Sequence, residues 1–331
     1  MTGRSPARLT KRFMSAKHSA APRMNRTPTV RLEAFSCIYP SICLCRKKVK
    51  RRAKRGLERG GKRWYNEGMK LILCCDYGID DAAATVDALL HAEEDGYSEV
   101  VLVAVGGNVP RGVALRNGAK LLAQCRFPHP PVTLVDTTAL SQPGEFLKAI
   151  HGDDGMGDLF PDVPVRAVPY AEWLSSLRGG YRLLSLGPMT LILPILERGT
   201  CERFVFMGGN IAEEPNYHGY EFNHALDRTA FAEAVKFPHA AVTMDTCRHP
   251  LFNIQPVDFA ADTLLKRIVL RARERTFLSG EKGCYLWDDI AVKVLRHPEW
   301  FAFEERSDRD GNVLCVARYV RGLPYPEVLE Q

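Results

Sequence analysis

Short apolar runs alternate with amphipathic stretches from Lys70 onward, and this alternation constrains the fold more than any other feature of the chain. Leu71–Cys75 is a continuous apolar run that ends at a turn, which is typical of a strand buried on both faces. Residues 80–93 then carry apolar side chains at helical spacing. Because this order recurs, we expect a mostly parallel, doubly wound open α/β sheet with flanking helices.

The same pattern predicts the remaining elements of the sheet. We expect a loop at residues 106–108 and a helix at residues 116–124. Further strands are expected at residues 100–105, 132–135, 181–185, 203–207 and 240–244, the last followed by Asp245. In sheets of this kind, ligands bind beyond the carboxyl ends of the strands, so the loops that follow the strands are where we expect chemistry.

Charge divides the chain into two regions. The net charge is +6, but residues 1–70 hold 20 of the 45 Lys and Arg residues and only 3 of the 39 Asp and Glu residues. The rest of the chain is therefore acidic. We predict a basic, disordered leader over residues 1–68 and one folded domain over residues 69–331.

The role of the basic leader is open at the sequence level. The functional chain could begin at Met69, with the leader as upstream translated sequence or a tail. A targeting peptide is a second interpretation, because the first 32 residues contain no acidic side chain. A nucleic-acid-binding tail is a third, although the run from Arg46 to Arg63 has no interleaved pattern of aromatic side chains. We expect no nucleic-acid partner for the folded domain.

The ten cysteines are scattered and include the adjacent pair Cys74 and Cys75 within an apolar run. They fit neither a secreted disulfide framework nor a paired zinc motif, so we expect a reducing, cytoplasmic environment. No apolar stretch approaches the roughly 20 residues of a membrane helix. The glycine pairs do not form a dinucleotide-binding fingerprint.

Three carboxylates follow the first predicted strand. Asp76 comes directly after it, Gly78 permits a turn, and Asp80 and Asp81 fall in the first turn of the predicted helix. Acids that converge in this way repel one another, and a divalent cation with oxygen ligands would relieve the repulsion. In the alternative interpretation, Asp80 and Asp81 only cap the helix and interact with its dipole.

Motifs in a fixed order resemble one enzyme family. The run from Cys74 to Asp81 resembles the DxDxxxDD fingerprint of the inosine-uridine preferring nucleoside hydrolase family. The other matching motifs are Gly107-Asn108, Arg116-Asn117, His151–Gly157, Leu186–Thr190, Met207–Gly209, Glu221–Asn223 with Asp227, and Trp287-Asp288. Together they extend from Met69 to about Leu295, and the resemblance implies a Rossmann-related, nucleoside-hydrolase-like sheet.

The resemblance implies calcium-dependent hydrolysis of the N-glycosidic bond of a ribonucleoside, giving ribose and a free base. The implied calcium ligands are the carboxylates of Asp76, Asp81 and Asp288 and the backbone carbonyl of Leu186. Asp76 would also orient and deprotonate a water bound to the ion, with Asn108 close to that water. The implied contacts with the nucleoside come from Asp80, Asn216, Glu221, Asn223 and Met207. A small-molecule nucleoside is therefore the expected partner, and the resemblance leaves a homo-oligomer open.

Two positions depart from the family pattern. Cys74 stands in place of the first fingerprint aspartate, and we expect it to weaken the support of Asp76 or of the metal without abolishing binding. Trp287 stands where uridine- and inosine-cleaving members carry a histidine acid. It resembles the tryptophan of the purine-specific branch, which stacks on the base, so purine preference follows as a hypothesis. The alternative is that Trp287 is a packed core aromatic.

Stacking alone does not replace a general acid. It contributes about 0.5–1.5 kcal/mol, whereas a general acid accelerates a reaction by roughly 10²–10⁴-fold. His151, His224 and His249 are candidate proton donors, and protonation by solvent is another route.

Two other functions compete with the hydrolase hypothesis. A binding protein that keeps the metal and ribose sites but has lost turnover would explain Cys74 and the missing histidine. An aspartate-nucleophile phosphohydrolase also begins its motif at the end of the first strand, but that chemistry needs a DxD pair, and Cys74 occupies the first of those two positions.

Overall fold

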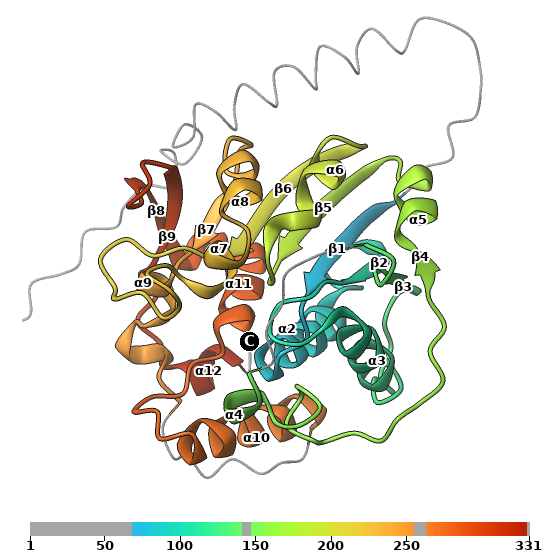
Figure 1. Cartoon of the computed structure of the whole chain (residues 1–331), viewed down its shortest axis with the longest axis horizontal. Helices are drawn as coiled ribbons and strands as arrows, with labels where there is room; N and C mark the ends of the chain where they lie inside the picture. The colour runs from blue at the N-terminus through green and yellow to red at the C-terminus, as the bar shows by residue number, and fades with distance from the viewer. Residues whose placement is uncertain (1–67, 141–146, 255–262, 330–331) are drawn as a thin grey trace, which may run out of the picture. The chain divides into compact units, whose positions relative to one another are not determined.

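The computed structural model describes residues 68–140, 147–254 and 263–329 (Figure 1). Their strands form one nine-stranded sheet in the order β4-β3-β2-β1-β5-β6-β7-β9-β8. The strands are β1 (Met69–Cys75), β2 (Tyr97–Ala104), β3 (Val132–Asp136), β4 (Val168–Pro169), β5 (Gly180–Ser185), β6 (Thr200–Met207), β7 (Ala240–Val242), β8 (Phe301–Ser307) and β9 (Val313–Tyr319). All neighbouring pairs are parallel except β8 and β9, which confirms the predicted fold class.

Helices connect the strands and cover the sheet. The longer ones are α2 (Ile79–His91), α3 (Arg111–Leu122), α10 (Leu264–Leu278) and α11 (Trp287–Arg296). The shorter ones are α4 (Lys148–His151), α5 (Tyr170–Ser176), α6 (Ile192–Leu196), α7 (Phe222–Leu226), α8 (Arg228–Ala234), α9 (Met244–Cys247) and α12 (Tyr325–Leu329). The 3-10 turns are Met189–Leu191, Pro250–Phe252 and Pro298–Trp300.

The direction of winding reverses at β1. Strands β2, β3 and β4 extend the sheet on one side of β1, and β5, β6 and β7 extend it on the other. Cys74 is in register with Val103 on one side and with Ser185 on the other. A reversal of this kind opens a crevice at the carboxyl ends of the two central strands. Asp76 follows β1 and Leu186 follows β5, so both lie at this crevice.

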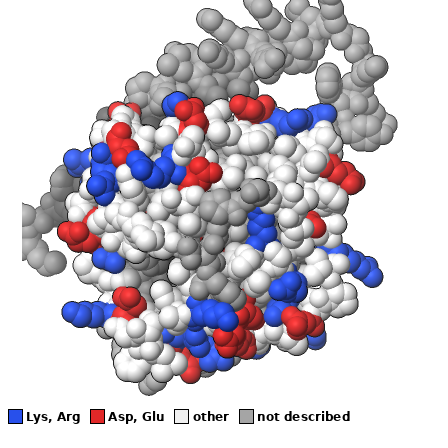
Figure 2. Space-filling model, in the orientation of Figure 1, with Lys and Arg blue, Asp and Glu red and all other residues white. Residues whose placement is uncertain are grey.

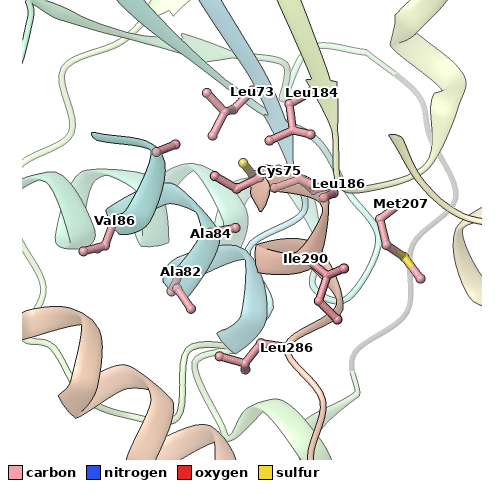
Figure 3. Packing of buried hydrophobic residues seen from close by; sticks show 14 of the residues in the cluster. Leu73, Cys75, Ala82, Ala84, Val86, Leu184, Leu186, Met207, Leu286 and Ile290 are labelled. Carbon is pink, nitrogen blue, oxygen red and sulfur yellow. The ribbon is translucent and has the colours of Figure 1, made fainter. Parts of the chain in front are cut away.

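Alternate residues of β1 face two apolar layers. Leu73 and Cys75 pack with residues of α2 and α11, including Ile290, in the larger layer (Figure 3). Ile72 and Cys74 pack into the smaller layer with residues of α5 and α6. The strand is buried on both faces, as the continuous apolar run predicts. Truncation of the fully buried Leu73 to alanine would destabilise the fold by about 2–5 kcal/mol.

The predicted elements begin or end between one and five residues from their predicted bounds, and two of these differences have a local cause. The expected strand over residues 240–244 ends at Val242, because Thr243 caps a short helix, α9, that contains Asp245. The helix expected at residues 116–124 begins earlier, at Arg111 directly after Pro110, and ends at Leu122. Proline with its fixed φ angle is well suited to the start of a helix.

The second half of the domain contains elements that the sequence pattern did not predict. They include α10, α11, α12 and the β8–β9 hairpin, which supplies the antiparallel edge of the sheet. The predicted leader, and with it the predicted domain boundary, lies largely outside the described residues and stays a prediction.

Surface and cysteine chemistry agree with an ordinary globular domain. Basic and acidic side chains are interspersed over the face shown in Figure 2. The thiols of Cys74, Cys75, Cys125, Cys247 and Cys284 are not in disulfide bonds. Among the described residues, no helix is both long enough and apolar enough to span a membrane.

Candidate active site

A hollow of about 690 Å³ lies beyond the carboxyl ends of the central strands. Its lining residues come from the segments that follow β1, β2, β5, β6 and α9, from α4 and α10, and from residues 280–288, which lead into α11. We call one part the deep end, formed by Asp80, Leu186, Glu221, Asn223 and Asp288, and the other the outer end, formed by Asn216, Arg248 and Trp287. The hollow lies where the fold class predicts a ligand.

Asp76 is fully buried and held by the loop after β2. Its Oδ2 accepts from the backbone N–H of Asn108 over 2.8 Å, and its Oδ1 accepts from the Asn108 side-chain amide over 2.9 Å. Gly107 and Gly187 allow this close fit, because a Cβ added at Gly107 would lie 1.9 Å from Asp76 Oδ2 and one at Gly187 would lie 3.0 Å from Asp76 Cβ. Both glycines are therefore required beside this carboxylate.

Three further carboxylates meet at the N-termini of two helices. Asp80 and Asp81 lie in the first turn of α2, and Asp288 lies in the first turn of α11. Their ligand atoms lie within 4.8 Å of one another. Asp76 adjoins this group, because its backbone N–H donates to Asp81 Oδ1 over 3.2 Å. Residues from the two ends of the domain thus form one acidic cluster: Asp76, Asp80, Asp81 and Asp288. Asp76 and Asp81 do not line the hollow themselves, and we include them in the deep end because they adjoin residues that do.

Crowding and burial make ionisation of this acidic cluster unfavourable. Burial raises the pKa of Asp81, and the neighbouring carboxylates of Asp288 and Asp76 raise it further. The pKa of Asp288 is raised by burial and then by Asp80 and Asp76. Burial also raises the pKa of Asp80 to about 6, and its Oδ1 has no hydrogen-bond partner in the described segments. A divalent cation would relieve this repulsion.

The helix-capping interpretation accounts for part of the geometry only. Asp81 accepts hydrogen bonds from the backbone N–H groups of Gly78, over 2.8 Å, and Asp76, over 3.2 Å. It therefore caps the first turn of α2 and belongs to the acidic cluster at once. Capping does not explain Asp80, whose buried Oδ1 lacks any such donor.

Glu221 and Asn223 complete the deep end. Glu221 is 2% exposed and caps α7 by accepting from the backbone N–H groups of Asn223, His224 and Gly209 over 2.8–3.0 Å. Burial raises the pKa of Glu221 to about 7. The Asn223 amide donates to the carbonyl oxygens of Leu186, over 2.8 Å, and Met207, over 3.2 Å. Asn223 is therefore fixed beside the Leu186 carbonyl predicted to be a ligand.

The outer end is more exposed. Trp287 begins α11 and is partly buried, whereas Asn216 and Arg248 are exposed. The Arg248 guanidinium carbon lies 5.9 Å from the centre of the Trp287 ring and its Nη1 donates to Glu213 over 3.1 Å. Trp287 thus lines the hollow next to Asp288 and also packs against the larger apolar layer, so its position fits both the stacking and the structural interpretation.

The three histidines considered as proton donors lie in different places. His224 does not line the hollow and stacks on Phe231, with ring centres 3.9 Å apart. His249 lines a different depression, next to β9. His151 lines the hollow, but its Nδ1 accepts from the backbone N–H of Ile79 and burial lowers its pKa to about 4. None of the three histidines both lines the hollow and is protonated at neutral pH.

Cys74 does not join the acidic cluster. Its side chain packs in the smaller apolar layer, and its backbone carbonyl accepts from the N–H groups of Leu186 and Gly187. Burial raises the pKa of the thiol, so it stays neutral.

Sequence reasoning missed Arg248, Tyr217 and Tyr285, which also line the hollow. Arg248 follows α9, the helix that replaces the end of a predicted strand, and it carried no motif of its own. The two tyrosines lie in loops, where no periodic pattern identifies a lining residue.

Comparison with known proteins tests the resemblance suggested by the motifs. The family model described as inosine-uridine preferring nucleoside hydrolase matches residues 71–322, which is most of the chain. The chain belongs to the inosine-uridine preferring nucleoside hydrolase family. It is therefore a hydrolase that acts on N-glycosyl bonds, and the phosphohydrolase alternative is wrong.

The names of the relatives of this nucleoside hydrolase differ mainly in the base specificity that they state. The non-specific ribonucleoside hydrolase RihC of Salmonella schwarzengrund is 31% identical over 258 residues, covering 71% of this chain and 81% of that protein. The pyrimidine-specific ribonucleoside hydrolase RihA of Shewanella woodyi is 24% identical over 280 residues, covering 75% and 88%. Among solved structures, a purine-preferring ribonucleoside hydrolase from Gardnerella vaginalis matches with a TM-score of 0.60 at 22% identity, covering 79% and 96%. This structural likeness supports the fold.

Proposed function

We propose that this nucleoside hydrolase cleaves the N-glycosidic bond of ribonucleosides, prefers purine nucleosides, depends on calcium, and releases ribose and the free base. The observation that carries the proposal is the meeting of Asp80, Asp81 and Asp288 at a hollow whose lining includes Asp80, Asp288, Glu221 and Asn223. Carboxylates, an amide and an aromatic side chain in one hollow match the three parts of a nucleoside reaction: a nucleophile, a sugar and a base.

The donor atoms fit a hard cation. Carboxylate and carbonyl oxygens are the ligands that calcium prefers, and the Leu186 carbonyl lies beside Asn223 at the deep end. The proposed ligands are Asp76, Asp81, Asp288 and the Leu186 carbonyl. When bound, calcium would supply positive charge that lowers the pKa of a neighbouring water.

Asp76 is the proposed base. Asn108 holds both of its oxygens, so the carboxylate has a fixed direction. Burial raises its pKa, which makes it a better proton acceptor than an exposed aspartate. We propose that Asp76 orients the attacking water and takes its proton, with Asn108 fixing the geometry.

The remaining residues of the deep end are proposed to bind ribose. Cleavage passes through an oxocarbenium-like state in which contacts with the sugar hydroxyl groups strengthen as the ring flattens. Asp80 and Asn223 line the hollow, and neither Asp80 Oδ1 nor Asn223 Oδ1 has a hydrogen-bond partner among the described residues. Each of these two oxygens can therefore accept a hydrogen bond from a ribose hydroxyl group. Glu221, Asn216 and Met207 complete the proposed sugar contacts.

Trp287 is proposed to stack on the leaving base. Its ring lies at the outer end, next to a proposed metal ligand, and a purine offers it more area than a pyrimidine does. Since none of the candidate histidines supplies a protonated acid here, protonation of the base by solvent is the proposed route. A cytoplasmic location and a homo-oligomer stay predictions.

A reducing-sugar assay on purine and pyrimidine ribonucleosides with calcium, followed by chromatography of the products, tests the proposal. We expect the protein to release ribose from ribonucleosides of this panel, with the highest kcat/KM for a purine nucleoside. The alternative, a family member that only binds nucleosides, is favoured if a nucleoside binds measurably and none of the panel releases ribose.

A further inference from the structure

Asp87 and Lys293 form an ion pair deep between two helices. The Lys293 Nζ donates to Asp87 Oδ1 over 3.1 Å, and the side chains are 1% and 0% exposed, respectively. Asp87 belongs to α2 and Lys293 to α11, and these helices pack against each other. Each helix also carries part of the acidic cluster, at its N-terminus.

Stability alone explains this pair poorly. Two charges taken out of water lose more hydration than their attraction commonly returns, and apolar replacements of such pairs are often neutral or stabilising. Asp87 Oδ2 has no hydrogen-bond partner in the described part of the chain, so the burial of this carboxylate is incompletely compensated. What the pair does provide is alignment, because few relative placements of the two helices bring Nζ to Oδ1.

The ion pair lies close to the acidic cluster along both helices. Asp87 is six residues beyond Asp81, and Lys293 is five residues beyond Asp288. At a rise of about 1.5 Å per residue, these separations are roughly 9 Å and 8 Å along the helix axes. A helix transmits a shift over such a distance almost unchanged. A sliding or rotation of α11 at Lys293 would therefore move Asp288 relative to Asp81.

Neighbouring contacts hold α11 in the same alignment. Tyr325 of α12 donates to Asp289 Oδ2 over 2.8 Å, and Asp289 directly follows Asp288. Nearer the other end of α11, Arg296 donates to Asp95, just beyond α2, over 3.0 Å. Between these two polar contacts, α11 contributes Ile290 to the larger apolar layer (Figure 3).

We propose that Asp87 and Lys293 are a positioning pair that fixes α11 against α2 and thereby holds Asp288 at the distance from Asp80 and Asp81 that cation binding requires. Neither residue lines the hollow, so the pair acts through the acidic cluster. The inference rests on the proposed cation site.

The charge of Lys293 and its proposed positioning role have opposite expected effects on calcium affinity. Removal of the Lys293 charge alone would strengthen cation binding electrostatically, because a positive charge leaves the vicinity of the acids. Asp87→Leu together with Lys293→Met removes one charge of each sign and leaves the net charge unchanged. Any loss of affinity in this double variant therefore reports geometry.

The test is calorimetric titration of the full chain with calcium chloride. We expect the double variant to bind calcium at least about tenfold more weakly than the wild type, as is usual when support of metal ligands is lost. Ile195→Ala, which opens a cavity in the smaller apolar layer, is the control for general destabilisation and should bind within about twofold of the wild type. Equal affinities of the double variant and the wild type would overturn the positioning role.

A second pair of variants covers the case in which the double variant does not fold. Asp87→Asn and Asp87→Ala remove the same charge, but only asparagine keeps an oxygen for the Lys293 Nζ. Positioning predicts calcium affinity near that of the wild type for Asp87→Asn and at least about tenfold weaker binding for Asp87→Ala. Identical affinities of these two variants would contradict it. A wild-type chain that binds no calcium would contradict the proposed cation site and, with it, this inference.

Discussion

At the deep end of the hollow, Glu221 and Asp288 are each 2% exposed, whereas Asn216 and Arg248 at the outer end are exposed and Trp287 is partly buried. The deep residues are fixed by backbone hydrogen bonds and by the N-termini of helices, and the outer residues come largely from loops. The named relatives share ribonucleoside hydrolysis but differ in base: non-specific, pyrimidine-specific and purine-preferring. From this contrast we propose that the deep end carries the chemistry that the family shares and that the outer end sets the base preference.

The largest expected effect is at the deep end. Asp81→Ala removes a proposed ligand and the cap of the first turn of α2, and we expect kcat/KM to fall by at least about 10³-fold on every nucleoside. Calcium should also no longer raise the melting temperature. Asp136→Ala is the matched control, because Asp136 ends β3 at the same edge of the sheet without lining the hollow. Normal turnover and calcium stabilisation in Asp81→Ala would mean that the ligand assignment is wrong.

Glu221→Gln should have a smaller effect that is again independent of the base. At pH 8, where a group with a pKa of about 7 is mostly ionised, loss of this charged hydrogen-bonding partner of the ribose predicts a decrease in kcat/KM of about 10- to 100-fold for purine and pyrimidine nucleosides alike. Asp227→Asn is the control, since Asp227 caps the neighbouring helix α8 and does not line the hollow. A base-dependent loss in Glu221→Gln would break the division between the two ends.

The support beneath the deep end should be sensitive to acid. Burial alone would raise the pKa of Asp87, but Lys293, His91 and Arg296 together outweigh it and lower the pKa to about 2, from an ordinary value near 3.8. Because the folded-state pKa is lowered, this stabilisation is present above about pH 4 and is lost as the pH falls toward 2. It amounts to on the order of 2 kcal/mol. Denaturant titrations should show this acid-dependent loss in the wild type and its absence in Asp87→Leu/Lys293→Met; equal pH profiles would contradict the role of the pair.

The smallest expected effect is at the outer end. Trp287→Ala should lower kcat/KM by up to about tenfold for purine nucleosides, the value expected for loss of stacking, with little change for uridine. Trp287→Phe should keep most of the purine activity because it retains an aromatic ring. Equal losses on purine nucleosides and uridine would show that Trp287 supports the deep end instead of selecting the base.

The sequence predicts the deep end better than the outer end for a physical reason. Asp76, Asp80 and Asp81 stand directly after a buried strand, and strand ends meet at one edge of a parallel sheet, so their convergence follows from local pattern. Asp288 could be placed only through the resemblance, since α11 was not predicted from periodicity. Arg248 follows a helix that the pattern described as the end of a strand.

Sequence patterns did not predict contacts between residues that are far apart in the chain. Asp87 and Lys293 are 206 positions apart, and each reads as a charged residue on the face of an amphipathic helix. Only the packing of α11 on α2 brings them together and buries them. The β8–β9 hairpin likewise becomes the edge of the sheet only through the pairing of β9 with β7.

Ribose release from inosine, measured after chelation and after calcium is added back, tests the central claim most directly when the wild type and Asp288→Asn are compared. The account predicts that chelation abolishes release by the wild type, that calcium restores it, and that calcium fails to restore it in Asp288→Asn at the same concentration. Undiminished release by the chelated wild type, or full recovery of Asp288→Asn at that calcium concentration, would contradict a cation held between the two ends of the domain.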